Sequence, residues 1–317
     1  MKAIICGEYG GADVLKYTEV PDPVPGPDEV RIKITAAGIN PVDTKIREGW
    51  LLQRLPHQLP IIPGWDAAGV VDMLGPGETT LSIGDRVYSY CRKPVVQWGA
   101  YAEYIVLPEN QVAPSPKTID DTAAAGVPLA ALTAWQSLFD AGQLKAGHRI
   151  LIHAGAGGVG AFAIQMAKHA GAYVVTTASR ANHTYMREIG ADMVIDYTAT
   201  DFRDAVLNAF PGGLDVVFDT VGGEVQTKSA DVLKRGGMLI SILAFQQEAA
   251  TNARGIQTRY VFVAPNRDQL VHIARLIDDG YLRVKLAAVL PLDHAVEAHR
   301  MIETRHTAGK IVLRIGV

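Results

Sequence analysis

The sequence has few cysteines and no long apolar run. Its two cysteines, Cys6 and Cys91, are too few for a disulfide framework in a chain of 317 residues. No stretch reaches the roughly 18 consecutive apolar residues of a membrane-spanning helix, and the first residues lack the apolar core of a signal peptide. We therefore expect a reduced, cytoplasmic protein without a membrane segment.

Neither positive nor negative charge is in large excess. The formal net charge is −3, so neither a nucleic acid nor an anionic membrane is expected as a partner. Apolar residues make up 48% and charged residues 20% of the chain, which is typical of globular proteins with large cores. The length is sufficient for two domains.

The first third of the chain is expected to be rich in β-structure. Apolar and charged residues alternate over 30–36, as in a half-buried strand. Similar short segments, separated by turns, occur at 69–74, 85–90 and 100–107. Short strands at regular spacing predict a barrel or a sandwich.

The pattern changes near residue 122, where an Ala- and Leu-rich segment (122–142) predicts a helix. Apolar strands and amphipathic helices then alternate. Strands are expected at 149–154, 172–178, 192–196, 215–219 and 238–244, and helices at 161–171, 180–190, 202–210 and 225–237. This order predicts an α/β domain with a doubly wound parallel sheet.

Beyond this sheet we expect a final edge strand at 259–263, helices at 268–280 and 293–304, and a closing strand at 310–317. Two domains follow from this reading. A β-rich catalytic domain comprises residues 1–124 and 267–317, and a dinucleotide-binding domain comprises residues 125–266.

The strongest local motif is a glycine turn with the pattern G-x-G-x-x-G. It contains Gly155, Gly157, Gly158, Val159 and Gly160. The turn follows an apolar strand and opens a helix, which is the context of a dinucleotide-binding turn. Glycines let backbone N–H groups approach a pyrophosphate, whose charge the helix dipole favours. A glycine-rich turn without a ligand is the weaker interpretation.

The end of the next strand predicts the type of dinucleotide. Enzymes that use NAD carry Asp or Glu there, whereas this chain has Ser179 and Arg180 and no acid. The planar donor fork of Arg180 suits a 2′-phosphate, and Ser179 adds a hydroxyl. We therefore predict NADP(H), although Arg180 would also be unremarkable as a solvated residue of the first helical turn.

Blocks from one end of the chain to the other carry a family resemblance. They lie at 36–49, 63–71, 84–88, 99–104, 128–139, 153–168, 190–197, 215–223 and 309–315. The chain resembles the zinc-free quinone oxidoreductase (zeta-crystallin-like) branch of the medium-chain dehydrogenase/reductase superfamily, and within it the NADPH-dependent alkenal/enone reductases. The resemblance implies a GroES-like β-rich catalytic domain beside a Rossmann domain.

The positions of the family's zinc ligands are altered in this sequence. Where zinc-dependent relatives carry Cys and His, this chain has Asn40 and Trp65, which cannot replace a thiolate and an imidazole. The structural zinc needs four cysteines, and only Cys91 lies in that region. We expect no metal, and without a Lewis acid the acceptor must already be electrophilic, as quinones and α,β-unsaturated carbonyls are.

The resemblance also assigns residues to a site. Expected NADP(H) contacts, besides the glycine turn, are Lys45, Ser179, Arg180, Tyr197, Ala244, Phe245, Phe262 and Val263. Asn40 and Lys45 are the candidate catalytic residues, and Trp50, Leu51, Trp65 and Phe245 are expected to line the substrate pocket.

Several roles stay open. Asn40 either hydrogen-bonds the substrate carbonyl or the nicotinamide ribose, or satisfies the turn before Pro41. Lys45 either holds a cofactor phosphate or ribose, steadies a developing enolate, or is a plain surface lysine. Each aromatic residue is equally consistent with core packing, and His153 is expected to be a satisfied core or loop histidine.

The predicted reaction is direct hydride transfer from NADPH to the β-carbon of an enone or to a quinone, with no general acid evident. An enoyl-thioester reductase is an alternative on the same scaffold. A non-catalytic NADPH-binding or RNA-binding crystallin-like protein is another. The edge strand at 259–263 invites pairing in a homodimer.

Overall fold

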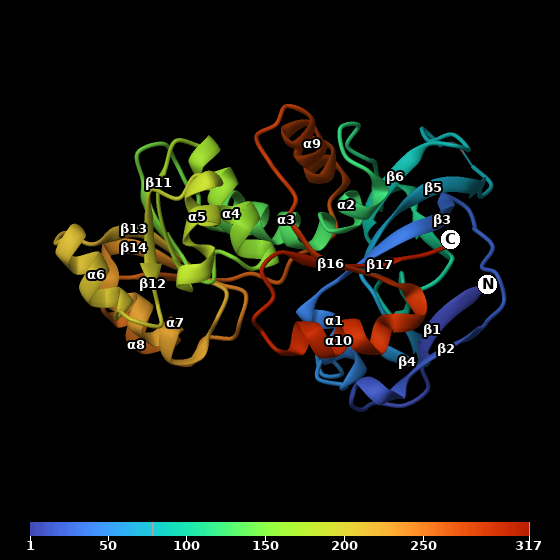
Figure 1. The fold of residues 1–317 in the computed structure, drawn as a ribbon, viewed down its shortest axis with the longest axis horizontal. Helices are drawn as coiled ribbons and strands as arrows, with labels where there is room; N and C mark the ends of the chain where they lie inside the picture. Colours follow the sequence, from blue (N-terminus) through green and yellow to red (C-terminus); the bar gives the residue numbers. More distant parts are fainter. Residues whose placement is uncertain (78, 317) are drawn as a thin grey trace. The chain divides into compact units, whose positions relative to one another are not determined.

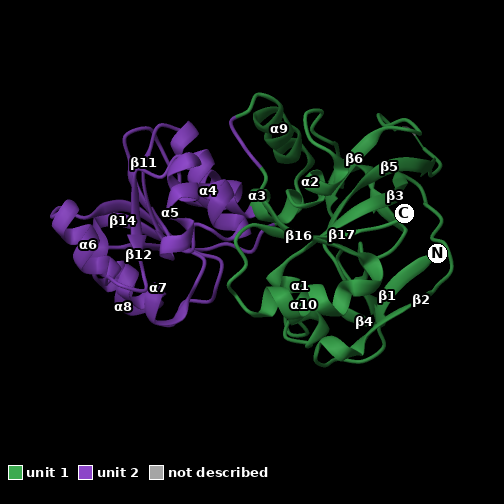
Figure 2. Cartoon of the chain, in the orientation of Figure 1, with its two compact units in different colours: residues 1–132, 264–280, 284–317 green, residues 133–263, 281–283 purple. Residues whose placement is uncertain are grey.

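The computed structural model describes residues 1–77 and 79–316, and the chain forms two compact units (Figure 2). Unit 1 comprises Met1–Leu132, Ala264–Gly280 and Val284–Val317, and unit 2 comprises Thr133–Val263 and Tyr281–Arg283. The divisions therefore lie at 132/133 and 263/264, compared with the expected 124/125 and 266/267.

The later first division has a physical reason in the packing of two short helices. Helix α2 (Asp121–Ala125) packs on strands of unit 1. At the start of α3 (Pro128–Trp135), the N–H of Leu129 donates to the buried carboxylate of Asp66 at 2.7 Å. This contact ties the beginning of the helical segment to the β-rich unit.

The single helix expected over 122–142 is wrong, because the segment is broken twice. Gly126 ends α2, and Pro128, which has no N–H to donate, begins α3. Residues Gln136–Ala141 then continue as a stretch of π-helix. Composition alone did not reveal these breaks.

Unit 1 is built around two sheets (Figure 1). The larger has the order β16 (Leu286–Pro291), β17 (Lys310–Arg314), β3 (Glu29–Ile39), β5 (Asp66–Leu74), β6 (Arg86–Tyr90) and β9 (Val112–Pro114), with β8 (Tyr104–Pro108) pairing β3. The smaller has the order β2 (Leu15–Glu19), β1 (Lys2–Cys6), β4 (His57–Ile62) and β7 (Val96–Trp98). The helices α1 (Pro41–Arg47), α9 (Arg267–Asp278) and α10 (Ala295–Glu303) complete the unit, with short 3₁₀ turns at Ala12–Val14, Glu109–Gln111 and Leu292–His294.

Unit 2 contains a six-stranded parallel sheet. Its order is β12 (Met193–Asp196), β11 (Tyr173–Ala178), β10 (Arg149–Ile152), β13 (Leu214–Asp219), β14 (Leu233–Ser241) and β15 (Gln257–Tyr260). The helices are α4 (Gly158–His169), α5 (His183–Glu188), α6 (Phe202–Ala209), α7 (Gly223–Ser229) and α8 (Glu248–Ala253), with 3₁₀ turns at Arg180–Asn182 and Ala230–Val232. The doubly wound Rossmann arrangement predicted from the sequence is confirmed.

Two boundaries in unit 2 differ from expectation. The helix expected over 225–237 ends at Ser229, because residues from Leu233 onward pair with β13 as part of β14. A register shift lies between Leu214 and Val216, and Gly236 adopts a positive φ of 81°, so this strand begins irregularly. Strand β15 ends at Tyr260 and lies at the edge of the sheet, where a homodimer contact stays a prediction.

Candidate functional site

The carboxyl ends of the parallel strands in unit 2 gather the predicted cofactor residues at one edge of the sheet. Register pairs Ile152 with Thr176 and Ala178 with Asp196, so β10, β11 and β12 end side by side. Strand order reverses between β10 and β13, which makes this the topological switch point where α/β sheets bind ligands.

Two glycines of the turn are required by internal packing. A Cβ on Gly155 would lie 2.1 Å from Oγ1 of Thr176, and one on Gly160 would lie 2.4 Å from the carbonyl oxygen of Ala154. Both distances are shorter than any ordinary contact. These glycines hold the first turn of α4 close to the sheet.

Gly157 differs, because nothing inside the protein requires a glycine there. It has an extended backbone with φ of −71°, and an added Cβ would have its nearest contact at 3.4 Å, with the carbonyl oxygen of Ala154. Gly157 directly precedes α4, whose first N–H groups lack intrahelical partners. The open space at Gly157 therefore fits the close approach of a phosphate group to the backbone.

The end of β11 is exposed and basic. Arg180 is exposed, and within residues 1–77 and 79–316 its guanidinium has no hydrogen bond or ion pair. Oγ of Ser179 accepts a hydrogen bond from Asn182 at 3.1 Å, and Tyr197, after β12, is 53% exposed. These residues are close enough in the sheet to contact one end of a dinucleotide.

The remaining predicted cofactor residues follow β14 and β15. Ala244 is exposed, Phe245 and Phe262 are half-buried, and Val263 is buried. Phe245 also packs against the hydrophobic core of unit 2, which agrees with the alternative of core packing.

Sequence reasoning missed a buried polar network after β13. Asp219 accepts from the N–H groups of Val221 and Gly222, both at 2.9 Å, through Oδ1. Its Oδ2 accepts from Gln226 at 3.1 Å and from Ser241 at 2.7 Å. The network fixes the loop after β13 against the end of β14, at the same edge as the glycine turn.

His153 is the satisfied core histidine that the sequence predicted. It is 1% exposed, with Nε2 2.9 Å from Oγ of Ser229 and Nδ1 3.3 Å from Oγ1 of Thr177. Ser229 donates its own proton to the carbonyl of Val225, so Nε2 of His153 is the donor. Burial lowers the pKa of His153 to about 4.

Replacing His153 with glutamine is expected to flatten the pH dependence of stability between pH 4 and 6.5. The folded-state pKa lies below the ordinary value of 6.5, so the stabilising contribution is complete above pH 6.5 and is lost as the pH falls towards 4. The loss in the wild-type protein is at most about 3 kcal/mol. Urea unfolding of both proteins at several pH values measures it, and parallel curves would contradict the assignment.

In unit 1 the amide of Asn40 lies within a buried charged cluster. Asn40, Asp66 and Lys310 are 2%, 0% and 5% exposed. Nδ2 of Asn40 donates to Asp66 at 2.9 Å, and Lys310 donates to Oδ1 of Asn40 and, at 3.0 Å, to the carbonyl of Ile39. Burial lowers the pKa of Lys310 and raises that of Asp66.

A second buried chain of hydrogen bonds joins α1 to α10. Tyr101 donates to Oδ2 of Asp43 at 3.0 Å, and Nε2 of His299 lies 3.3 Å from the Tyr101 hydroxyl. Oδ2 of Asp43 also accepts from the N–H of Asn40 at 2.8 Å. Burial raises the pKa of Asp43 to about 7 and lowers that of His299 to about 3. These hydrogen bonds fix the position of α1, the helix that begins after Asn40.

Replacing Arg47 with methionine is expected to lower the free energy of unfolding by about 2–4 kcal/mol. Arg47 is 1% exposed and donates to the carbonyl of Gly10 at 2.9 Å, to Nδ1 of His299 at 3.1 Å and to Glu303 at 2.6 Å. The matched control is Arg300→Met on α10, whose pair with Asp13 is exposed and contributes below about 1 kcal/mol. Urea unfolding compares them, and equal losses would contradict the account.

Lys45 is half-buried on α1, and its ammonium group has no hydrogen-bond or ion-pair partner among residues 1–77 and 79–316. Burial, and to a smaller extent the positive charge of Arg305, lowers its pKa.

The predicted substrate residues of unit 1 divide into two groups. Trp65 is 4% exposed, stacks edge-on against Tyr90 with centroids 5.9 Å apart, and lines a narrow groove with Ile46, Lys93 and Trp98. Trp50 is 70% exposed, and neither Trp50 nor Leu51 lines the groove. Most residues that line the groove are of apolar types, with Lys93 and Gln97 among them.

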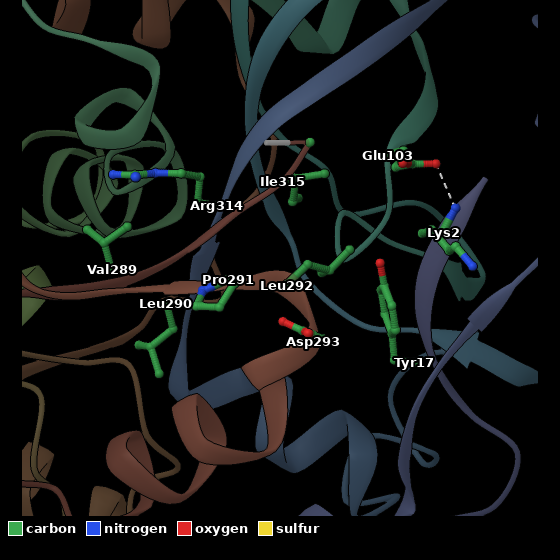
Figure 3. Close-up of a pocket in the computed structure, with 11 residues that line it drawn as sticks. Lys2, Tyr17, Glu103, Val289, Leu290, Pro291, Leu292, Asp293, Arg314 and Ile315 are labelled. Carbon is green, nitrogen blue, oxygen red and sulfur yellow. Dashed lines mark hydrogen bonds between the residues drawn. The ribbon is translucent and has the colours of Figure 1, made fainter.

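A larger cavity of about 400 Å³ also lies on unit 1 (Figure 3). Its lining includes Lys2, Tyr17, Glu103 and Asp293, and Glu103 accepts a hydrogen bond from the N–H of Lys2 at 2.7 Å. None of the predicted site residues lines it. Its mixed charges and open rim point to no particular ligand.

Among the residues that the structure describes, no group of three or more His, Cys, Asp or Glu side chains is arranged to hold a metal ion. In the same residues, no helix combines the length and the apolar character needed to cross a bilayer.

Comparison with known families identifies the type of protein. Residues 26–117 match the alcohol dehydrogenase GroES-like domain, and residues 189–313 match the zinc-binding dehydrogenase domain. An Arabidopsis thaliana protein described as a chloroplastic NADPH-dependent alkenal/one oxidoreductase is 37% identical over 99% of this chain and 79% of its own length. The chain belongs to the medium-chain dehydrogenase/reductase superfamily. The resemblance and the fold class predicted from the sequence are thereby confirmed.

Solved structures of other superfamily members have the same fold as this chain. The quinone oxidoreductase of Coxiella burnetii has a TM-score of 0.90 and 33% identity, and covers 100% of this chain and 99% of its own. Escherichia coli quinone oxidoreductase, solved with NADPH, has a TM-score of 0.90 and 29% identity over 99% of this chain and 100% of its own. The superfamily is one of oxidoreductases, which places this chain among enzymes of that class.

Proposed function

We propose that this protein is a zinc-independent reductase that uses NADPH to reduce α,β-unsaturated carbonyl compounds or quinones. The observation that carries the proposal is the end of the sheet in unit 2. There the open backbone at Gly157 and the exposed guanidinium of Arg180, which makes no hydrogen bond or ion pair among the described residues, offer a phosphate cradle and a 2′-phosphate ligand, and β11 itself ends without an acid.

The residues that would hold NADPH are the N-terminus of α4 for the pyrophosphate and Ser179 and Arg180 for the 2′-phosphate. Lys45 is the further cofactor contact that the family resemblance assigns. When bound, NADPH supplies the hydride. The named relatives that reduce alkenals and quinones support this choice of cofactor and acceptor.

Zinc independence rests on the residues at the family's ligand positions. Asn40 is occupied by hydrogen bonds to Asp66 and Lys310, and Trp65 packs in a ring contact with Tyr90. Neither side chain is a zinc ligand. The protein's own contribution is therefore to bind and orient an acceptor that is already electrophilic.

A steady-state assay of NADPH and NADH oxidation tests the proposal. The acceptors are 3-buten-2-one, 1,4-benzoquinone and 9,10-phenanthrenequinone, each with and without EDTA. We expect NADPH-selective turnover that EDTA leaves unchanged. NADPH binding without turnover of any acceptor would instead support thioester substrates or a non-catalytic role.

A further inference from the structure

The orientation of the Asn40 amide is fixed by the chemistry of its partners. The ammonium of Lys310 can only donate, and the carboxylate of Asp66 accepts. Lys310 donates to Oδ1 of Asn40, and Asp66 accepts from Nδ2 at 2.9 Å. Because Lys310 and Asp66 flank one amide, the carbonyl side and the N–H side of Asn40 cannot exchange without breaking both contacts.

This arrangement leaves one donor of Asn40 unused. The amide nitrogen carries two protons, and Asp66 accepts only one. In the part of the chain that the structure describes, no second acceptor lies at Nδ2, while Asn40 is 2% exposed. A buried N–H without an acceptor costs about 1–3 kcal/mol. An oxygen atom of a bound ligand would remove that cost.

Lys310 is held in place for this role by several contacts. It is 5% exposed, and its ammonium donates to the carbonyl of Ile39 at 3.0 Å and lies 3.5 Å from Asp66. The buried carboxylates of Asp66 and Asp43 favour its charged form, against the effect of burial. A residue of the last strand thus reaches the residue that precedes α1.

We propose that Lys310 and Asp66 are positioning residues that orient the Asn40 amide so that its free N–H donates to the carbonyl oxygen of the bound acceptor. The proposal rests on the proposed reductase function, and within it assigns Asn40 as a donor rather than an acceptor. Lys310 acts only through Asn40.

The chemistry of enone reduction explains why the orientation matters. Hydride from NADPH forms a C–H bond at the β-carbon, and the C=C electron pair moves to make an enolate whose charge lies on the former carbonyl oxygen. The nicotinamide loses two electrons, and a proton from water then completes the α-carbon. An N–H donor stabilises the enolate oxygen, and one such donor is worth about 10²–10³-fold in rate at other enzymes. A reversed amide would oppose that charge with its own oxygen.

The test is a double-variant cycle in the full-length protein with 3-buten-2-one and NADPH varied up to saturation. Lys310→Met removes the donor to Oδ1 of Asn40, so that only the contact with Asp66 still holds the amide in its orientation. We expect kcat to fall about 10-fold or more, while KM for NADPH stays within about 2-fold. Asn40→Ala should cause a similar fall, and Lys310→Met should cause no further loss in the Asn40→Ala background.

Two further variants separate positioning from folding. Arg314→Met removes an exposed cation from the same strand and should leave kcat unchanged. The pair Asp66→Asn with Lys310→Met removes the opposite charges of both residues together, and it should still show the loss of kcat with a nearly normal melting temperature. The proposal would be overturned if the Asp66→Asn, Lys310→Met double variant had the kcat of the wild-type protein. It would also be overturned if the losses of kcat in Lys310→Met and Asn40→Ala multiplied when the two substitutions were combined. A wild-type protein that reduces none of the acceptors would contradict the reductase function itself.

Discussion

Replacing Gly157 with alanine is expected to weaken NADPH binding by about 10- to 100-fold while the protein keeps its fold and stability. The added methyl group meets only the carbonyl oxygen of Ala154, at 3.4 Å, so nothing inside the protein resists it. A phosphate that must approach the backbone at Gly157 is pushed away from the N–H groups at the start of α4. Titration of NADPH fluorescence measures the affinity.

Two matched glycine variants serve as controls. Gly160→Ala places a Cβ 2.4 Å from the backbone oxygen of Ala154, so it should lower stability by about 1–3 kcal/mol or more. Gly212→Ala, where a Cβ meets nothing within 4 Å, should change neither stability nor binding. If Gly157→Ala bound NADPH like the Gly212→Ala control, the phosphate would not lie at this turn.

Replacing Arg180 with alanine is expected to lower kcat/KM for NADPH by about 10- to 100-fold and to leave the value for NADH nearly unchanged. The exposed guanidinium makes no hydrogen bond or ion pair among residues 1–77 and 79–316, and its charge acts on Asp196 only as the last of several causes that lower that pKa. Its loss should therefore fall mainly on the cofactor that carries a 2′-phosphate. Initial rates with both cofactors and one acceptor measure the two constants.

The control for Arg180 is Arg187→Ala, which removes an exposed arginine from α5 in the same unit. It should leave both constants unchanged, apart from a small effect of overall charge. Equal losses with NADPH and NADH for Arg180→Ala would show that Arg180 does not distinguish the cofactors.

The sequence predicted the Rossmann unit well because its signals are local. Buried parallel strands such as β10 and β13 are short apolar runs, and the glycine turn lies directly between a strand and a helix. His153 was also interpreted correctly, since a histidine at the end of a buried strand is surrounded by core.

Errors arose where tertiary packing decided the structure. Residues 233–237 continue an amphipathic-looking helical segment in the sequence, but pairing with β13 makes them part of β14. The segment 122–142 has uniform composition, yet Gly126 and Pro128 divide it. Local propensity is a weak guide when long-range pairing competes with it.

The buried cluster around Asn40 lay beyond the reach of sequence reasoning. Lys310 contacts Asn40 across 270 residues, and His299 meets Arg47 across 252. Lys310 and His299 each belong to an ordinary strand or helix pattern, so the sequence around them did not indicate that they contact Asn40 and Arg47. The candidate at Asn40 followed from the resemblance, whereas its donor role follows from the contacts.

The most direct test of the account is isotope transfer from the cofactor. NADPH deuterated at the transferring position of C4 is incubated with the protein, EDTA and 3-buten-2-one, and the product is examined by NMR. Direct hydride transfer predicts deuterium on the β-carbon of the saturated ketone and none at the α-carbon. Product formed without deuterium at the β-carbon, or turnover abolished by EDTA, would contradict direct, zinc-independent hydride transfer.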